Sequence, residues 1–159
     1  MSSAAPAVPA INGAAFTVGL VAARYNPALT DALLDTVRGQ LLDAGVKPGR
    51  LEVIRVPGSA ELPVAALWLA EGGRCDCVVA LGVLVKGDTA HHRIVGQAAT
   101  DALQRVALAT RIPVINGVLV VENARQAVAR CHPRSGRGPE FACAALAMAA
   151  LKRAQGGRA

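Results

Sequence analysis

Residues 77–85 read CVVALGVLV and are followed at once by KGDTAHH at 86–92. An almost wholly apolar stretch of this length is typical of a strand that is covered on both faces. Such strands belong to parallel sheets, whose crossover helices lie on either side. The polar residues at 86–92 would then stand at the carboxyl end of a central strand, where ligands bind in such folds.

The rest of the chain alternates apolar stretches with segments of helical spacing. Leucine or valine recurs at every fourth residue from Leu29 to Leu41, which predicts a helix over 28–45 that ends at Gly45. The expected strands are residues 15–22, 51–56, 77–85 and 113–121, and the other expected helices are residues 60–72, 89–110, 123–131 and 139–154. This order predicts an α/β fold: a flavodoxin-like, three-layer αβα sandwich around a four-stranded parallel sheet.

The length of 159 residues fits one domain. We expect a flexible N-terminal arm over 1–13, which is rich in Ala and Pro, and a single domain over 14–159. The longest apolar run, residues 141–151, is shorter than the roughly 20 residues that span a bilayer. A signal peptide would require basic residues before its apolar region, but no Lys or Arg precedes Arg24. We therefore expect a cytoplasmic protein with no membrane partner.

The net charge of +6 is unevenly placed, because residues 124–159 hold seven basic residues and one acid. Such an excess favours an anionic ligand such as a phosphate. Within it, we expect the terminal Lys152, Arg153 and Arg158 to be a solvated tail. The chain has only four aromatic residues, too few for a platform that stacks single-stranded bases. We expect no nucleic-acid partner.

The cysteines are expected to be reduced, small apolar thiols. Cys75 and Cys77 have C-x-C spacing, which is not the usual two-residue spacing of a zinc site. The histidines, at positions 91, 92 and 132, leave a metal site as the alternative. Our expectation for metal is none.

The segment 86–92 carries the richest chemistry. Gly87 allows a sharp turn, Asp88 or Thr89 could cap the following helix, and a helix N-terminus favours phosphate. His91 would lie in the first helical turn, where a histidine can transfer protons near neutral pH. The alternative is that Asp88 and Thr89 only cap the helix and that both histidines are surface residues. Lys86 could be a Schiff-base nucleophile, or could simply extend from the strand end into solvent.

Two other predicted strand ends carry polar or aromatic groups. After residues 51–56, the sequence VPGSAELP places Ser59 at a plausible N-cap and Glu61 in the first helical turn. Glu61 could complement the helix dipole, or accept hydrogen bonds from a polar ring or sugar hydroxyls. Tyr25 follows the first strand, where it could stack on a planar ligand or pack in the core.

These segments together resemble the 6,7-dimethyl-8-ribityllumazine synthase family over about residues 15–153. The resemblance is carried by RYN at 24–26, VPGSAELP at 56–63, GVLVKGDTAHH at 82–92, GVL within PVINGVLVVEN at 113–123, RQAVAR at 125–130 and GPEFACAALAMAAL at 138–151. It implies condensation of 5-amino-6-(D-ribitylamino)uracil with 3,4-dihydroxy-2-butanone 4-phosphate, which yields the lumazine, phosphate and water. It also implies that no cofactor is needed.

The resemblance further implies a role for individual residues. His91 matches the family's general acid/base. For the pyrimidine and its ribityl chain, the residues implied are Tyr25, Ser59, Ala60, Glu61, Val83, Leu84, Val85 and Asn116. For the phosphate, they are Asp88, Thr89 and Arg130, of which the arginine often comes from a neighbouring subunit in the family.

Several positions depart from the family pattern, among them Lys86, Asp88 and the turn CHPRSGRGPE at 131–140, and two of the departures bear on the proposed pyrimidine site. Asn116 stands where the family usually has Phe, and His92 stands where an aromatic residue usually follows the catalytic histidine. These changes motivate an alternative function: a non-catalytic paralogue that binds flavin or lumazine, or that only forms a shell. The resemblance implies small-molecule substrates and a homo-oligomer, either a pentamer or a multiple of pentamers.

Overall fold

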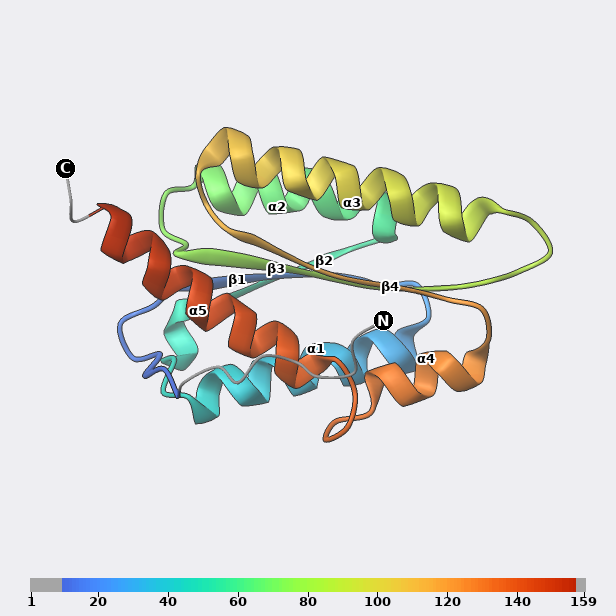
Figure 1. Cartoon of the computed structure of the whole chain (residues 1–159), viewed down its shortest axis with the longest axis horizontal. Coiled ribbons are helices and arrows are strands. Elements are labelled where there is room, and N and C mark those ends of the chain that lie inside the picture. The colour runs from blue at the N-terminus through green and yellow to red at the C-terminus, as the bar shows by residue number, and fades with distance from the viewer. Residues whose placement is uncertain (1–9, 157–159) are drawn as a thin grey trace.

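The computed structural model describes residues 10–156 and shows an α/β fold built on one sheet (Figure 1). The strands are β1 (Val18–Ala23), β2 (Leu51–Val56), β3 (Cys77–Val85) and β4 (Val114–Val121). The α-helices are α1 (Pro27–Asp43), α2 (Leu62–Glu71), α3 (His91–Thr110), α4 (Ala124–Cys131) and α5 (Gly138–Gly156), and the short 3-10 helices are η1 (Pro48–Arg50) and η2 (Ser59–Glu61). The predicted succession of strands and α-helices is confirmed.

The four strands pair in the order β2-β1-β3-β4, and every pair is parallel. The predicted fold class is therefore confirmed. The bounds of β2 and β3 are those predicted, but β1 begins at Val18 rather than at residue 15. Its pairing starts there because Val18 lies opposite both Leu51 and Cys77, the first residues of the two flanking strands.

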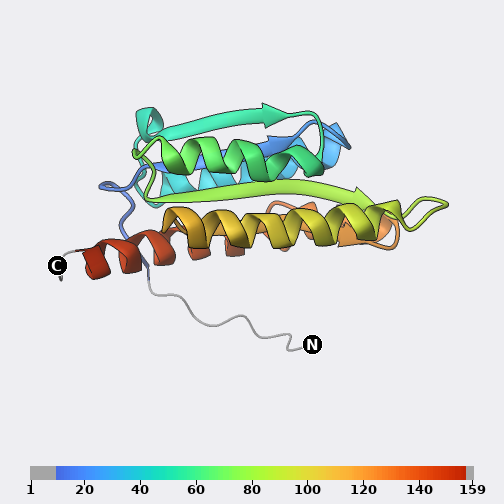
Figure 2. The same cartoon turned by 90° about the horizontal axis from the view of Figure 1, so that it is seen from above.

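Side chains alternate between the two faces of the sheet, and each face has its own core. In β3, Val79 and Leu81 belong to the core under α1, α4 and α5, whereas Val78 and Ala80 belong to the core under α2 and α3. Figures 1 and 2 show the two groups of helices on opposite sides of the sheet. Coverage of both faces explains why residues 77–85 are apolar throughout.

The same alternation bears on the C-x-C pair. Cys75 packs in the core on the α2–α3 side, and Cys77 packs in the core on the other side. Burial raises the pKa of the Cys77 thiol to about 12, so this sulfur stays protonated at neutral pH. Within residues 10–156, no three His, Cys, Asp or Glu side chains gather as metal ligands.

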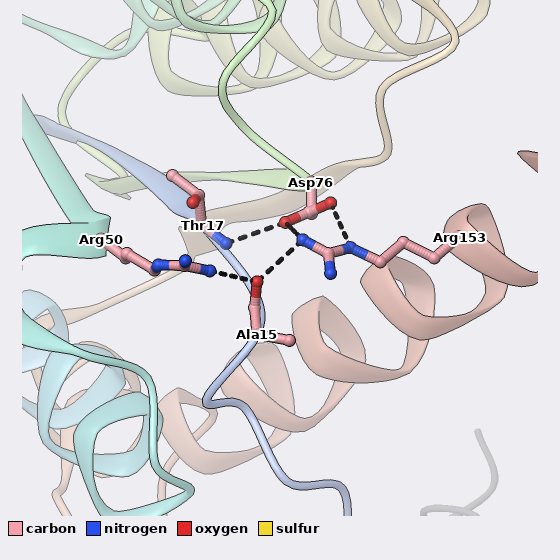
Figure 3. Close-up of polar contacts among 5 residues, drawn as sticks. All are labelled: Ala15, Thr17, Arg50, Asp76 and Arg153. Carbon is pink, nitrogen blue, oxygen red and sulfur yellow. Dashed lines mark hydrogen bonds and ion pairs between the residues drawn. The ribbon is translucent and has the colours of Figure 1, made fainter.

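The end of α5 is anchored to the amino ends of β1 and β3. Arg153 Nε and Nη2 donate hydrogen bonds of 2.8 Å to the two carboxylate oxygens of Asp76, and Nη2 also donates to the Ala15 carbonyl (Figure 3). The carboxylate in turn accepts the Thr17 N–H at 2.9 Å. The prediction that Arg153 belongs to a solvated tail is therefore wrong, because the nearly buried carboxylate of Asp76, just before the central strand β3, binds it. Arg158 lies outside the described residues.

Residues 10–13 of the predicted arm lie against the domain. Ile11 packs against the core on the α1–α5 side, and the Gly13 N–H donates a hydrogen bond of 2.7 Å to the Ala44 carbonyl. The remainder of the predicted arm, residues 1–9, lies outside the described part of the chain. None of the helices described is both long and apolar enough to cross a membrane.

Candidate functional site

The carboxyl ends of the four strands lie at the same end of the sheet, where β3 and β4 end level, at Val85 and Val121, and extend further than β1. The pairing of β1 with β3 ends at Ala22 and Leu81, so Gly82–Val85 continues beyond this pairing, and β3 extends further than β1 (Figure 2). There the Asn26 Nδ2 donates a hydrogen bond of 2.8 Å to the Val83 carbonyl. The loop after β1 is thereby fixed to the extended part of β3.

Tyr25, beside this hydrogen bond, is 73% exposed. The alternative that Tyr25 packs in the core is therefore wrong. Its main chain is fixed nevertheless, because its carbonyl accepts a hydrogen bond of 2.8 Å from the Thr30 hydroxyl. An exposed ring on a fixed loop can stack on a planar ligand with little loss of conformational entropy.

The loop after β2 places its three predicted residues differently. Ser59 is buried against Gly82, where a side chain at position 82 would meet the Ser59 hydroxyl. Ser59 is not an N-cap as predicted, because Gly58 holds that position for η2 and Glu61 holds it for α2. Ala60 and Glu61 are exposed, and the Glu61 carboxylate accepts the Gly58 N–H at 2.8 Å. Glu61 therefore precedes α2 and shapes the loop, with lone pairs free for further donors.

The turn between β3 and α3 also departs from expectation. The helix begins at His91 with Ala90 as its N-cap, and no side chain caps it, so neither Asp88 nor Thr89 has the predicted capping position. Both are exposed, and the Thr89 hydroxyl accepts a long hydrogen bond of 3.4 Å from the His91 N–H. The His91 side chain is exposed, whereas His92 is buried. The alternative that both histidines are surface residues is wrong for His92.

A charged group that the sequence analysis did not identify flanks this turn. Glu122, just after β4, accepts a hydrogen bond of 2.6 Å from Arg93 and pairs with the Lys86 ammonium at 3.2 Å. The hydrogen bonds from Arg93 and then from Lys86 lower the pKa of the Glu122 carboxyl. The Lys86 side chain is half exposed and is paired as a cation with this carboxylate. The position of Glu122 at a strand end was the available signal.

Asn116 lies away from this group of loops. It is opposite Ala80 in the middle of β4, the edge strand, and its Nδ2 donates a hydrogen bond of 2.9 Å to the Thr100 hydroxyl on α3. Its Oδ1 accepts the Val118 N–H at 3.0 Å. Within one chain, the structure does not bring Asn116 to the loops that carry Tyr25 and His91.

Helices α3 and α4 lie on opposite sides of the sheet (Figure 1). His91 is the first residue of α3, and Arg130 is in the last turn of α4. The start of α4 is capped reciprocally, because the Asn123 side chain accepts the Gln126 N–H and the Gln126 side chain accepts the Glu122 N–H, each at 2.9 Å. Arg130 and Arg137 border a cavity of about 350 Å³, and the Arg137 N–H donates to the Arg130 carbonyl at 2.7 Å. Within one chain, Arg130 and the β3–α3 turn therefore do not meet.

Known proteins resemble this chain over most of its length. The family model described as 6,7-dimethyl-8-ribityllumazine synthase matches residues 15–153. A protein of that name from Halorhodospira halophila is 42% identical over 135 residues, which cover 84% of this chain and 86% of the relative. One from Thermococcus onnurineus is 40% identical over 139 residues, which cover 87% of this chain and 90% of the relative. The chain belongs to the 6,7-dimethyl-8-ribityllumazine synthase family.

Proposed function

We propose that this chain condenses 5-amino-6-(D-ribitylamino)uracil with 3,4-dihydroxy-2-butanone 4-phosphate, the penultimate step of riboflavin biosynthesis. The observation that carries the proposal is the meeting of four loops at one edge of the sheet in a chain of this family. Among them, an exposed aromatic ring, an extended strand end and an exposed histidine at a helix N-terminus supply the three kinds of group that the reaction needs.

The chemistry requires proton transfers rather than a metal or an organic cofactor. An amine of the pyrimidine attacks the ketone and forms an imine with loss of water. Phosphate then leaves by β-elimination, and ring closure releases water again. Holding both substrates in register supplies much of the rate enhancement. We assign His91 as the general acid/base, because its exposed imidazole stands at the start of α3 and can exchange protons with both substrate and solvent.

We place the pyrimidine at the exposed Tyr25 ring and at the part of β3 that extends beyond β1. A strand edge offers main-chain N–H and carbonyl groups in a fixed array, which suits the alternating donors and acceptors of a pyrimidine. No strand within residues 10–156 pairs with Gly82–Val85 on the β1 side. We assign Val83, Leu84 and Val85 to the ring, and Ser59, Ala60 and Glu61 to the ribityl hydroxyls. Asn116 remains a predicted contact.

We place the phosphate at the N-terminus of α3. The N–H groups of its first turn, where the His91 N–H makes only a long hydrogen bond, and the Thr89 hydroxyl are donors for a phosphate oxygen. Asp88 is exposed, and solvent screening of its charge limits its repulsion of the anion. Arg130 would complete the site from a neighbouring subunit, because in its own chain it lies across the sheet from His91.

This division of the site supports a homo-oligomer, which we propose to be a pentamer or a multiple of pentamers. Exposed apolar side chains, including Trp68 at 61% and Leu108 at 80%, lie on α2 and α3, on the face away from Arg130. Sedimentation would show a particle of at least five 16.2 kDa chains. A monomer that turns over both substrates would contradict the proposal. The free thiols of all four cysteines are consistent with a cytoplasmic location.

The proposed activity is tested by kinetics on purified wild-type protein and on a His91→Ala variant. Lumazine is followed by its absorbance with both substrates present. We expect turnover in the wild type and a loss of about 10²- to 10⁴-fold in kcat when the general acid/base is removed. A folded wild-type protein that binds lumazine or flavin without making lumazine would support the non-catalytic alternative instead.

A further inference from the structure

The two adjacent histidines at the start of α3 point into different surroundings. His91 is exposed, whereas His92 is only 5% exposed. Successive residues of a helix are turned by about 100°, so one imidazole faces solvent and the next faces inward. The proposed reaction uses His91 and leaves the buried imidazole of His92 without a role.

Both histidines hydrogen-bond to the same residue, Thr89. The His91 N–H donates to its hydroxyl, and His92 Nδ1 lies 3.3 Å from its carbonyl oxygen. A carbonyl oxygen only accepts, so this hydrogen bond assigns the proton to Nδ1. His92 Nε2 then carries a lone pair, and it is buried with no hydrogen-bond partner among the described residues. The bond to Thr89 is therefore the one hydrogen bond that the described residues give this ring.

The turn that His92 holds has few other attachments. Residues 86–90 are all exposed, and no atom lies within 4 Å of a side chain built at Gly87. Lys86 is fixed through its N–H, which donates to the Val121 carbonyl at 2.9 Å. Beyond it, the His92 imidazole is the one described side chain that hydrogen-bonds to the main chain of residues 87–90. Without this bond, Thr89 would be held by the long hydrogen bond from the His91 N–H and by its neighbour Ala90, whose carbonyl accepts the Arg93 and Ile94 N–H groups.

We propose that His92 is a positioning residue, whose Nδ1–H fixes the β3–α3 turn in the conformation that receives a phosphate group. This rests on the proposed function, which places the phosphate of the second substrate at Thr89 and the start of α3. A cavity of about 220 Å³ is bounded by the turn, His92 and Arg93, large enough for a phosphate. A turn fixed in advance binds the anion without first losing conformational freedom.

Three substitutions separate this role from simple core packing. His92→Phe fills the space of the imidazole but has no hydrogen-bond donor. His92→Asn places an N–H group close to the position of Nδ1. His92→Gln places an N–H group close to the position of Nε2. We expect His92→Phe and His92→Gln to raise the KM for the butanone phosphate by about 3- to 10-fold, the value of one hydrogen bond. The KM for the pyrimidine should stay near wild type, and His92→Asn should recover most of the loss.

Direct binding of inorganic phosphate, measured by calorimetry, gives the same comparison without turnover. The Kd should rise in His92→Phe and His92→Gln but much less in His92→Asn. Equal losses in all three variants, or an unchanged Kd and KM in His92→Phe, would overturn the proposal. If the four proteins show the expected order of Kd values but the wild type makes no lumazine, the proposed reaction is overturned and the role of His92 stands.

The tautomer of the resting protein supplies a spectroscopic test. NMR of protein labelled with ¹⁵N-histidine should show one ring with its proton on Nδ1, and that signal should disappear in His92→Phe. Assignment of the proton to Nε2 of His92 would remove the hydrogen bond on which the proposal depends.

Discussion

The Asn26 side-chain amide donates a 2.8 Å hydrogen bond to the carbonyl of Val83, a residue 57 positions further along the chain. This bond joins the loop that carries Tyr25 to the part of β3 that continues beyond β1. The two sides of the proposed pyrimidine site are therefore held at a fixed separation by one side chain. Asn26 also has a left-handed backbone, with φ at 53°, which Asn tolerates better than most residues.

Removal of this side chain should loosen the pyrimidine site. Asn26→Gly deletes the hydrogen bond while it keeps the left-handed backbone unstrained. We expect the free energy of unfolding to fall by about 1 kcal/mol, and the KM for the pyrimidine to rise several-fold with a smaller change in kcat. Denaturant unfolding and steady-state kinetics measure the two effects.

A matched control is Asn26→Asp. Aspartate also tolerates the left-handed backbone conformation, but it places a carboxylate against the Val83 carbonyl. Repulsion between the two oxygens should raise the KM for the pyrimidine at least as much as Asn26→Gly does. A wild-type KM in both variants would show that this hydrogen bond does not organise the site.

The contact between Gly82 and Ser59 predicts a second effect. A methyl group at position 82 would meet the Ser59 hydroxyl and lie 3.2 Å from the Leu62 Cδ1. Gly82→Ala should therefore lower the free energy of unfolding by about 1–3 kcal/mol, as overpacking does. Ser59→Ala in the same chain should recover part of that loss, because it removes the nearest atom. Additive effects in this double-mutant cycle would argue against the contact.

The Asp76–Arg153 pair predicts a pH dependence of stability. Burial alone would raise the pKa of Asp76, but hydrogen bonds from Arg153 and from the Thr17 N–H outweigh it, and the pKa falls below its ordinary value of 3.8. A carboxyl with a lowered pKa stabilises the fold above the pKa of the unfolded chain, and this stability is lost as the pH falls through the lowered value. Asp76→Asn should cost about 1–3 kcal/mol at pH 7.

The difference between wild type and Asp76→Asn should narrow as the pH is lowered below 3.8, the ordinary pKa. Urea unfolding of both proteins across this range measures it. Arg153→Lys is the companion variant, because an ammonium cannot reproduce the two parallel hydrogen bonds of the guanidinium. A difference that stays constant with pH would show that the charge of Asp76 does not stabilise the fold.

The separation of Arg130 from His91 predicts complementation between subunits. His91→Ala and Arg130→Ala should each lose most activity when assembled alone. Chains mixed before assembly should form some sites with both residues intact, about a quarter of them if mixing is random and each site uses two neighbours. If the two variants assemble together but recover no activity, His91 and Arg130 either act in a site formed by one chain or lie outside any site.

Much of the fold could be predicted because its strands are short apolar segments with clear ends. Residues 51–56 and 77–85 were bounded correctly, since Pro57 and Lys86 stop the apolar pattern. The start of β1 was predicted too early, because Phe16 continues the apolar pattern although pairing with the neighbouring strands begins only at Val18. Helix α3 was predicted to begin at 89, but the turn continues through Ala90.

The site was harder to predict, because its contacts join distant elements. The strand ends identified Tyr25, Glu61 and His91 as candidate ligand contacts, and the structure shows all three residues exposed. Helical spacing alone does not show which of His91 and His92 is buried, because which imidazole faces inward depends on where the helix begins. The Lys86–Glu122–Arg93 contacts depend on the pairing of β3 with β4, and sequence spacing does not determine that pairing.

The measurement that tests the account most directly follows both products in one reaction. Purified wild-type protein is mixed with the pyrimidine diamine and the butanone phosphate, and lumazine absorbance and phosphate release are recorded together. The account predicts that both products form at the same rate, one for one, well above the uncatalysed background. A folded, assembled protein that leaves the rate of lumazine formation at background would contradict it.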